Sequence, residues 1–379
     1  MRACMTPRER VWAALNHREV DRIPIDLGGT PNSTMCTGAY ENLKAFIGVD
    51  VPTEELSKAF EIVRMDEAVL SRLPVDTRPL FANPPARSRV RWLDEHTFIG
   101  DWGITYRRPD NWTQFDMIAH PLAEATIEDL ERYDWPDVED EGRYVGLRDR
   151  ARDLHDNTDY AVCASTGDTC IFDVSWILRG MEQFLVDLLL DPEFTLALME
   201  KVAQIQFRRH ECFLKEVGSY IDVIMIADDM GIQNGPLIKP ALYRKMVKPF
   251  HKRYVQLIKG RTDAQVVVHA CGSIVDLIED YIEIGVDALH PMQVLAAGMS
   301  PQNLKQQFGG RMAFWGGVDT QHLLPRGKPE DVRQAVRDTI RAMGLDGGYI
   351  LGAVHNVQDD VSPENVWAML DEAANLRSA

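Results

Sequence analysis

Short apolar runs alternate with longer amphipathic stretches from residue 160 to the end of the chain. The apolar runs cover residues 160–164, 223–227, 266–268, 288–289, 312–314 and 349–351. The amphipathic stretches have helical spacing and cover residues 176–217 (with a break near 191–192), 240–259, 274–284, 329–343 and 363–376. This alternation is expected of a parallel β-sheet wrapped by helices. The second half of the chain is therefore predicted to be α/β.

The first 75 residues have a different pattern. Thr6 can cap a helix that has Pro7 in its first position and Glu9 in its third, which predicts a helix over residues 7–17. Residues 22–29 are typical of a short strand that ends in a glycine turn. Helical patterns follow at residues 39–47 and 54–73. Together these segments predict an N-terminal helical extension.

Residues 76–125 differ in composition from the segments on either side. Pro, Trp and β-forming residues dominate there, and apolar and polar positions alternate over residues 98–107, which predicts a hairpin. We interpret residues 76–125 as a β-rich insertion over the mouth of the fold. The alternative is a peripheral flap that has no contact with substrate.

Polar side chains come almost directly after the apolar runs. They are Asp168, Asp228, Asp229, His269, Cys271, His290, Asp319, His355 and Asn356. In barrels of parallel strands, catalytic groups project from the carboxyl ends of the strands. The G-x-G-x-x-G spacing of a dinucleotide site does not occur. We therefore predict a (β/α)8 TIM barrel that forms one domain over residues 1–379.

Charge and cysteine content narrow the class of protein. The 58 acidic and 41 basic residues give a net charge of −17, and no Lys/Arg block could follow a phosphate backbone, so no nucleic-acid partner is expected. The six cysteines lack a disulfide-framework spacing, and neither a signal peptide nor an apolar run of about 18 residues occurs. We expect a cytoplasmic protein with no membrane association, and one that could form a homodimer.

His269 and Cys271 are the most informative candidates for chemistry. On an extended backbone, residues two apart point to the same side, so this imidazole and this thiol can converge on one point. Both are good zinc ligands, and a third ligand from another strand would leave the fourth position open, as in a catalytic zinc site. The alternative is a buried cysteine beside a hydrogen-bonded histidine.

Asp228, Asp229 and His355 are candidate catalytic groups at the ends of other strands. Two adjacent carboxylates at a strand end can act as acid/base groups, as metal ligands or as anchors for a substrate cation, or can simply cap a helix and form a solvated turn. His355 can be a metal ligand, a general acid/base or a structural hydrogen-bonding group. The candidate substrate contacts are Asp26, Trp102, Gln233, His290 and Asn356, although such residues often only pack or cap.

Several motifs carry a family resemblance. They are residues 5–10, 21–24, 227–231, 269–273, 284–289, 315–319 and 362–365. In this order and spacing they resemble the uroporphyrinogen decarboxylase superfamily over nearly the whole chain. The resemblance implies a (β/α)8 barrel, in agreement with the interpretation of the hydrophobic pattern.

The resemblance implies one of two chemistries. Uroporphyrinogen decarboxylases remove acetate carboxyl groups without a cofactor and hold the substrate with an arginine-rich N-terminal segment, whereas this chain has Asp26-Leu27-Gly28-Gly29-Thr30 there. The superfamily's cobalamin-dependent methyltransferases bind zinc through H-x-C and a distant third cysteine. His269 and Cys271 match the first two positions, but no cysteine follows Cys271, and the C-terminal segment offers His355 instead.

We therefore predict a methyltransferase that moves a methyl group between a small methylated substrate and a corrinoid, thiol or folate acceptor. Zinc held by His269, Cys271 and His355 is expected to assist, and a corrinoid would be carried by a partner protein. One alternative is a cofactor-free decarboxylase of uroporphyrinogen type, which needs cationic residues in the mouth such as Arg22, Arg78 and Arg107. The other alternative is a non-catalytic partner of a corrinoid protein.

Overall fold

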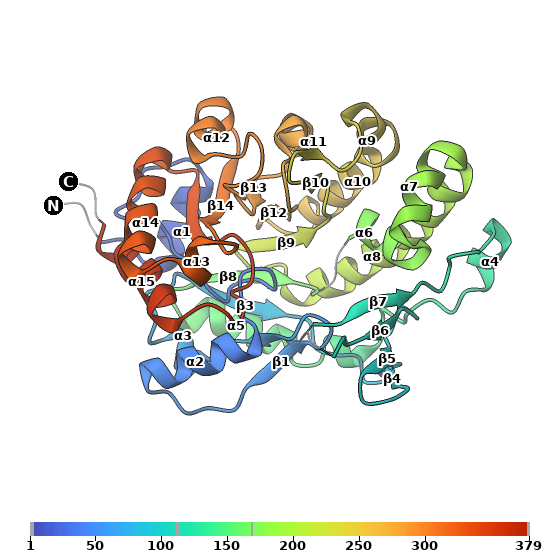
Figure 1. Ribbon diagram of the computed structural model, residues 1–379, viewed down its shortest axis with the longest axis horizontal. Helices are drawn as coiled ribbons and strands as arrows, with labels where there is room; N and C mark the ends of the chain where they lie inside the picture. The colour runs from blue at the N-terminus through green and yellow to red at the C-terminus, as the bar shows by residue number, and fades with distance from the viewer. Residues whose placement is uncertain (1–3, 111–113, 168–169, 377–379) are drawn as a thin grey trace.

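Seven parallel strands form the central sheet of the computed structural model, which describes residues 4–110, 114–167 and 170–376 (Figure 1). In sheet order they are β15 (Tyr349–Ala353), β14 (Ala313–Val318), β13 (Ala288–His290), β12 (Gln265–His269), β9 (Val223–Ala227), β8 (Ala161–Ser165) and β3 (Thr77–Phe81). Each of the six predicted apolar runs overlaps one of these strands, so the α/β prediction is confirmed.

The sheet closes into a barrel through residues 24–26, which lie between β15 and β3. Ile25 forms a parallel bridge with Leu351, and the carbonyl of Ile25 accepts a hydrogen bond from the backbone N–H of Asp76 at 2.8 Å. In place of the strand predicted over residues 22–29, the structure has a single bridge residue, Ile25. Pro24 has no N–H to donate, and the N–H of Ile25 binds the Asp76 carboxylate instead of a strand carbonyl.

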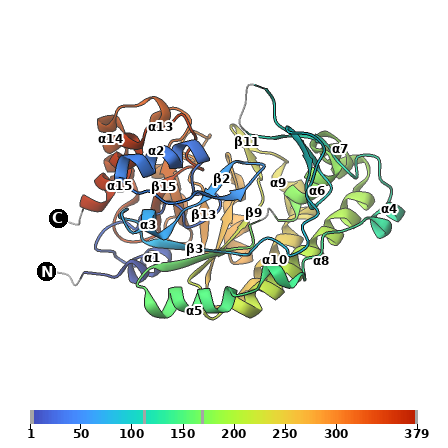
Figure 2. The same ribbon diagram turned by 90° about the horizontal axis from the view of Figure 1, so that it is seen from below.

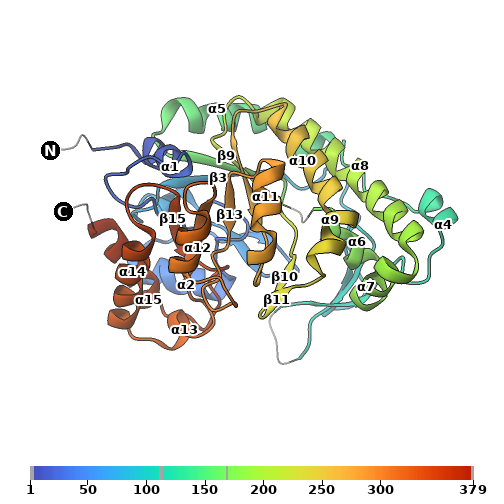
Figure 3. The ribbon, with the colours of Figure 1, turned by 90° about the horizontal axis from the view of Figure 1, so that it is seen from above.

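Helices cover the outside of the barrel, and α8, α10 and α11 follow one another around it (Figure 3). The helices are α1 (Pro7–Leu15), α2 (Thr37–Ile47), α3 (Glu67–Leu70), α4 (Ile127–Arg132), α5 (Leu147–Asn157), α6 (Phe172–Arg179), α7 (Met181–Leu190), α8 (Pro192–Val217), α9 (Pro240–Met246), α10 (Lys248–Lys259), α11 (Ile278–Ile284), α12 (Pro301–Phe308), α13 (Leu323–Arg326), α14 (Pro329–Met343) and α15 (Pro363–Asn375). Within the described ranges, none of them combines the length and apolar character needed to cross a bilayer.

The N-terminal segment is predicted correctly at its first helix and wrongly after α2. Thr6 and Glu9 form the expected capping box at the start of α1. The helix predicted over residues 54–73 is wrong: the structure has a hairpin of β1 (Glu54–Ser57) and β2 (Ile62–Arg64), followed by the single-turn α3. The backbone of this hairpin forms a hydrogen bond with the segment before α2: the N–H of Val63 donates to the carbonyl of Met35 at 3.0 Å.

The β-rich excursion begins later than residue 76, since β3 belongs to the barrel. Its antiparallel sheet consists of β4 (Arg91–Trp92), β5 (Thr97–Ile99), β6 (Thr105–Arg107) and β7 (Asp116–Ala119), and it stands beside α6 and α7 (Figure 2). The N–H of Leu122 donates to the carbonyl of Leu178 at the end of α6. Two residues before β7, Gln114 donates to the side chain of Gln358 at 2.9 Å, three residues beyond His355. The excursion therefore contacts the edge of the barrel at which β15 ends.

Candidate functional site

The carboxyl ends of the parallel strands bring polar side chains to one edge of the barrel. His269 ends β12, and in the sheet register it pairs with Ala227 of β9 on one side and with His290 of β13 on the other. β15 ends at Ala353, two residues before His355. Because the strands are parallel, residues far apart in the sequence meet at this edge. Asp168, which is also expected at a strand end, lies outside the described residues.

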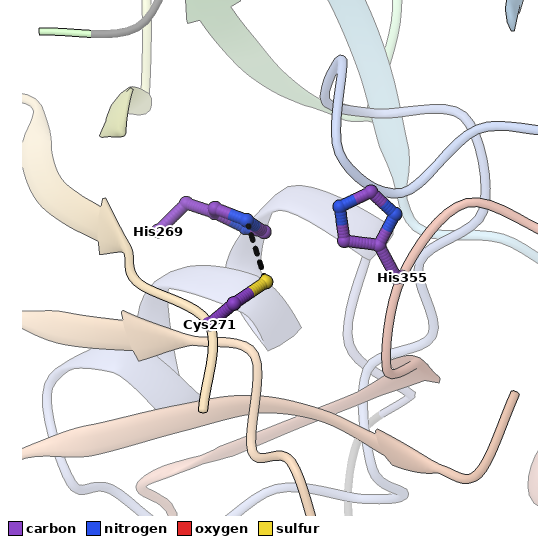
Figure 4. A group of neighbouring side chains, drawn as sticks. All are labelled: His269, Cys271 and His355. Atoms are coloured by element: carbon purple, nitrogen blue, oxygen red, sulfur yellow. Dashed lines mark hydrogen bonds between the residues drawn. The ribbon is translucent and has the colours of Figure 1, made fainter. Parts of the chain in front are cut away.

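His269, Cys271 and His355 form a cluster at this edge (Figure 4). One potential ligand atom from each residue lies within 4.8 Å of those from the other two. Sγ of Cys271 is 3.3 Å from Nε2 of His269, and the two imidazole centroids are 5.4 Å apart. Figure 4 shows His355 facing the other two side chains from the loop after β15. The structure thus brings together the three side chains that the sequence suggests as ligands.

Two imidazole nitrogens and one thiol sulfur are a donor set that suits zinc and leaves a fourth position for a substrate atom. Burial lowers the pKa of His269 to about 3. Burial, and secondarily the neighbouring His269, lowers the pKa of His355 to about 4. Both imidazoles are therefore neutral near pH 7 and have a lone pair for a metal.

Asp229 lies beside the cluster. Its Oδ1 accepts a hydrogen bond from the backbone N–H of Cys271 at 2.7 Å and is 3.7 Å from Nε2 of His269. Burial raises the pKa of the Asp229 carboxyl. Burial, and secondarily the charge of Asp229, raises the pKa of the Cys271 thiol well above its ordinary range. Asp229 therefore holds the backbone of Cys271 in place and can exchange a proton close to the Cys271 sulfur.

Asp228 has a different environment from Asp229. Its carboxylate is buried and accepts hydrogen bonds from the backbone N–H groups of Ile171, Phe172 and Asp173, at the start of α6. It also lies 2.9 Å from Nε2 of His251. In this position Asp228 acts as a helix cap, the alternative that its sequence context left open.

The sequence analysis does not single out His251 or Asp173. The carboxylate of Asp173 accepts a hydrogen bond from the backbone N–H of Asp229 at 2.9 Å, and burial, with the charges of Asp228 and Asp229, raises its pKa well above the ordinary range. Neither residue belongs to a motif or directly follows one of the apolar runs that predict the strands. Only the packing of α6 and α10 against the strand ends brings them to this position.

Two of the candidate substrate contacts are fully buried. Asp26 accepts hydrogen bonds from the N–H of Gly29, from the Thr77 hydroxyl and, at 3.1 Å, from the Trp315 indole. His290 lies next to His269, and their Nδ1 atoms are 2.7 Å apart. The structure therefore places both side chains in the interior of the fold, with His290 against the cluster residue His269.

The other three candidate substrate contacts have partners elsewhere in the fold. Asn356 accepts a hydrogen bond from the N–H of Thr34 at 2.9 Å. Gln233, in the hairpin of β10 (Gly231–Ile232) and β11 (Gly235–Pro236), donates to the carbonyl of Leu295. Trp102, in the excursion, packs edge-on against Trp135, which follows α4.

Two of the three candidate arginines for carboxylate binding form ion pairs, and the third lies in the excursion. Arg22 forms an ion pair with the buried Asp76 at 2.7 Å, and Arg78 one with Glu67 at 2.7 Å. Arg107 is exposed on β6 in the excursion. Arg22 and Arg78 are therefore neutralised by carboxylates and do not supply the free cationic groups that a decarboxylase of this type needs.

The loop after β12 is held by close backbone packing. Gly272 has φ of +84°, and a Cβ on it would lie 2.4 Å from the backbone carbon of Gly231. Its N–H donates to Oε1 of Gln293 at 2.7 Å. Glycine is required here because only it combines this backbone angle with this close approach. Cys271, one residue earlier, is thereby held in place by the backbone packing of Gly272 and by the hydrogen bond of its own N–H to Asp229.

A curled sheet of seven parallel strands, whose two edges are connected through residues 24–26, with a His/Cys/His cluster at the carboxyl ends defines a TIM-barrel-like α/β protein with a candidate metal centre. The family model described as "Uroporphyrinogen decarboxylase (URO-D)" matches residues 116–376. The chain therefore belongs to the uroporphyrinogen decarboxylase (URO-D) family.

The similar proteins include a decarboxylase and a methyltransferase. A uroporphyrinogen decarboxylase of Methylococcus capsulatus is 34% identical over 67 residues, which cover 18% of this chain and 19% of the relative. A methylated-thiol–coenzyme M methyltransferase of Methanosarcina mazei is 25% identical over 239 residues, which cover 62% of this chain and 59% of the relative. The chain thus spans about a fifth and about three fifths of these two proteins.

One solved structure supports the fold over almost the whole chain. The structure of a "methyltransferase from Methanosarcina mazei" superposes with a TM-score of 0.64 at 16% identity and covers 97% of this chain and 98% of that one. At this identity the likeness shows the fold alone, and it agrees with the barrel predicted from the sequence.

Proposed function

We propose that this chain is a zinc-dependent methyltransferase. The observation that carries the proposal is the convergence of His269, Cys271 and His355 at the carboxyl edge of the barrel. The similarity to a methyltransferase over 239 residues supports the same reaction class. The substrate we propose is a small methylated molecule, with a corrinoid on a partner protein, a thiol or a folate as acceptor.

The three cluster residues would hold the zinc through Nε2 of His269, Sγ of Cys271 and one ring nitrogen of His355. When bound, zinc supplies Lewis acidity that stabilises a thiolate acceptor or the leaving heteroatom of the donor. Asp229 has the geometry to hold the proton that such a group loses or gains, because its Oδ1 lies 3.7 Å from Nε2 of His269. Asp228 would act indirectly, by fixing the start of α6 beside Asp229.

The ligand set bears on which acceptor is used. It has one thiolate and two neutral imidazoles, whereas the family resemblance implies two thiolates and one imidazole. Fewer thiolates donate less electron density, so the metal polarises its fourth ligand more strongly and makes a bound thiolate less nucleophilic. This favours a role in which the metal activates the methyl donor or its leaving group.

Metal analysis of the chain purified without added metal tests the zinc site. We expect close to one zinc per chain in the wild type and a large loss in Cys271→Ser. The matched control is Cys212→Ser, because Cys212 is a free, half-buried cysteine on α8, and it should leave the zinc content unchanged. Substoichiometric zinc in the wild type that Cys271→Ser does not alter would contradict the proposal.

The reaction class needs a separate test. The zinc-loaded protein is incubated with reduced cobalamin and a panel of methylated thiols and methylated amines, and formation of methylcobalamin is followed by its absorption spectrum. A parallel incubation with uroporphyrinogen, followed by mass spectrometry, tests for loss of carboxyl groups. Methyl transfer without decarboxylation is expected. Decarboxylation alone would overturn the proposed activity, and no turnover would favour the non-catalytic partner.

A further inference from the structure

His290 lies directly behind the cluster, with its imidazole against that of His269. The two Nδ1 atoms are 2.7 Å apart, and the ring centroids are 4.9 Å apart at an interplanar angle of 31°. We propose that His290 is a positioning residue, which accepts a hydrogen bond from Nδ1–H of His269 and so holds Nε2 of His269 toward the metal. This inference rests on the proposed zinc site.

The hydrogen bond determines where the protons are. A neutral imidazole carries one proton, so Nε2 of His269 can donate its lone pair to zinc only when the proton is on Nδ1. Nδ1 of His290 is then the acceptor, and His290 keeps its own proton on Nε2. Ligating histidines usually donate their second N–H to a carboxylate, a carbonyl or water. Here the acceptor is a neutral ring, which adds no negative charge behind a metal that has a single thiolate ligand.

The fold fixes the position of His290. It ends β13 and pairs in register with His269 on the neighbouring strand. The indole of Trp315 on β14 meets the His290 ring edge-on at 6.4 Å, and its Nε1 donates to the buried Asp26. His290 has no exposed surface. A side chain enclosed in this way contacts the ligand His269 and is closed to a substrate in the mouth.

The environment of Nε2, the second ring nitrogen of His290, makes it possible to distinguish a positioning role from a structural role by experiment. Within the described part of the chain, its Nε2 has no hydrogen-bond partner. A buried polar atom without a partner opposes folding, so an apolar side chain of similar size should be tolerated at this position. A structural role predicts that such a replacement lowers stability and leaves zinc affinity unchanged. A positioning role predicts weaker zinc binding in a protein that remains folded.

The experiment compares His290→Leu with His290→Asn in the full chain. Leucine removes the acceptor, and asparagine can place Oδ1 near the original Nδ1 position. The control is His210→Leu, because His210 is equally buried but bonds the Tyr254 hydroxyl behind the sheet. Zinc affinity is measured by competition with a chromophoric chelator, the geometry at the metal by the visible spectrum of the Co²⁺-loaded protein, and folding by thermal melting.

We expect His290→Leu to bind zinc about 10- to 100-fold more weakly, with an altered Co²⁺ spectrum. His290→Asn should recover most of the affinity, and His210→Leu should bind like the wild type. His290→Met replaces the leucine variant if that protein does not fold. A folded apolar variant with wild-type affinity and spectrum overturns the inference while leaving the zinc site intact. Failure of the wild type to bind zinc overturns both.

Discussion

The carboxylate of Asp229 accepts a hydrogen bond from the backbone N–H of Cys271 at 2.7 Å, and the same oxygen lies 3.7 Å from Nε2 of His269. One side chain therefore fixes the backbone that carries the proposed sulfur ligand and also lies within reach of a proton at the proposed zinc site. These two roles can be separated, because only the second needs an ionisable group. An amide at this position can still accept from Cys271 but cannot carry the proton.

Asp229→Asn should therefore retain zinc and lose activity. We expect zinc content close to that of the wild type and a fall in the rate of methyl transfer of about 100-fold, within the range found when a general acid or base is removed. Asp229→Ala loses both roles and should also bind zinc more weakly. The measurements are metal analysis and initial rates on the same preparations. An asparagine variant with the wild-type rate would mean that Asp229 has only its backbone role.

Zinc affinity should rise with pH, because the metal must displace a proton from Cys271. Burial and Asp229 raise the pKa of this thiol well above its ordinary range, so it is protonated at pH 7 in the metal-free protein. The pKa values of about 3 for His269 and about 4 for His355 mean that both rings are already neutral there. One proton should leave per zinc bound, and affinity should increase about tenfold per pH unit from pH 5 to beyond 9.

Titration calorimetry in buffers of different ionisation enthalpy measures this proton release. Below pH about 4, His355 and then His269 become protonated, so zinc should compete with additional protons and the dependence should steepen. Cys271→Ser should release no proton in the neutral range. An affinity in the wild type that does not change between pH 6 and 8 would show that the thiol is not a ligand.

Asp228 should matter for folding more than for chemistry. Its carboxylate accepts three backbone N–H groups at the start of α6 and contacts His251, all in a buried environment. Asp228→Ala leaves these groups without their partner, so the free energy of unfolding should fall by about 3–5 kcal/mol. Ser362→Ala is the control: Ser362 caps α15 by accepting from the N–H of Asn365, and its loss should cost about 1 kcal/mol.

Urea-induced unfolding followed by circular dichroism measures both changes. Asp228→Asn keeps one acceptor oxygen, so its free energy of unfolding should lie between those of Asp228→Ala and Ser362→Ala. If Asp228→Ala is as stable as Ser362→Ala, the buried network around α6 contributes less than its hydrogen bonds indicate. Whichever Asp228 variant folds should still bind zinc, because its carboxylate points to α6 and not to the cluster.

The proximity of the three cluster residues was predictable, because it follows from strand position. An apolar run ending at Val268 sets His269 and Cys271 on one side of an extended backbone, and the run at 349–351 brings His355 to the same edge. The choice among the roles left open for Asp228 was not predictable, because its partners, such as His251 on α10, are set by helix packing.

The errors in the fold have a similar origin. Residues 54–73 have helical spacing, yet backbone bonds with the segment around Met35 favour a hairpin there. The barrel strand β3 contains Arg78 and Pro79, so it does not have the apolar run by which the other strands were found. In both cases tertiary contacts outweigh the local pattern.

His355→Cys tests whether this chain differs from the methyltransferases it resembles only in its third ligand. A cysteine there would give zinc two thiolates and one imidazole, so zinc should remain bound and a thiolate at the fourth position should become more nucleophilic. We expect the thiolate-to-metal absorption of the Co²⁺-loaded variant to be about twice that of the wild type, since it scales with the number of thiolate ligands. Transfer to thiol acceptors should increase, whereas His355→Ala should lose most of the metal. If His355→Cys shows the wild-type absorption, residue 355 does not bind the metal.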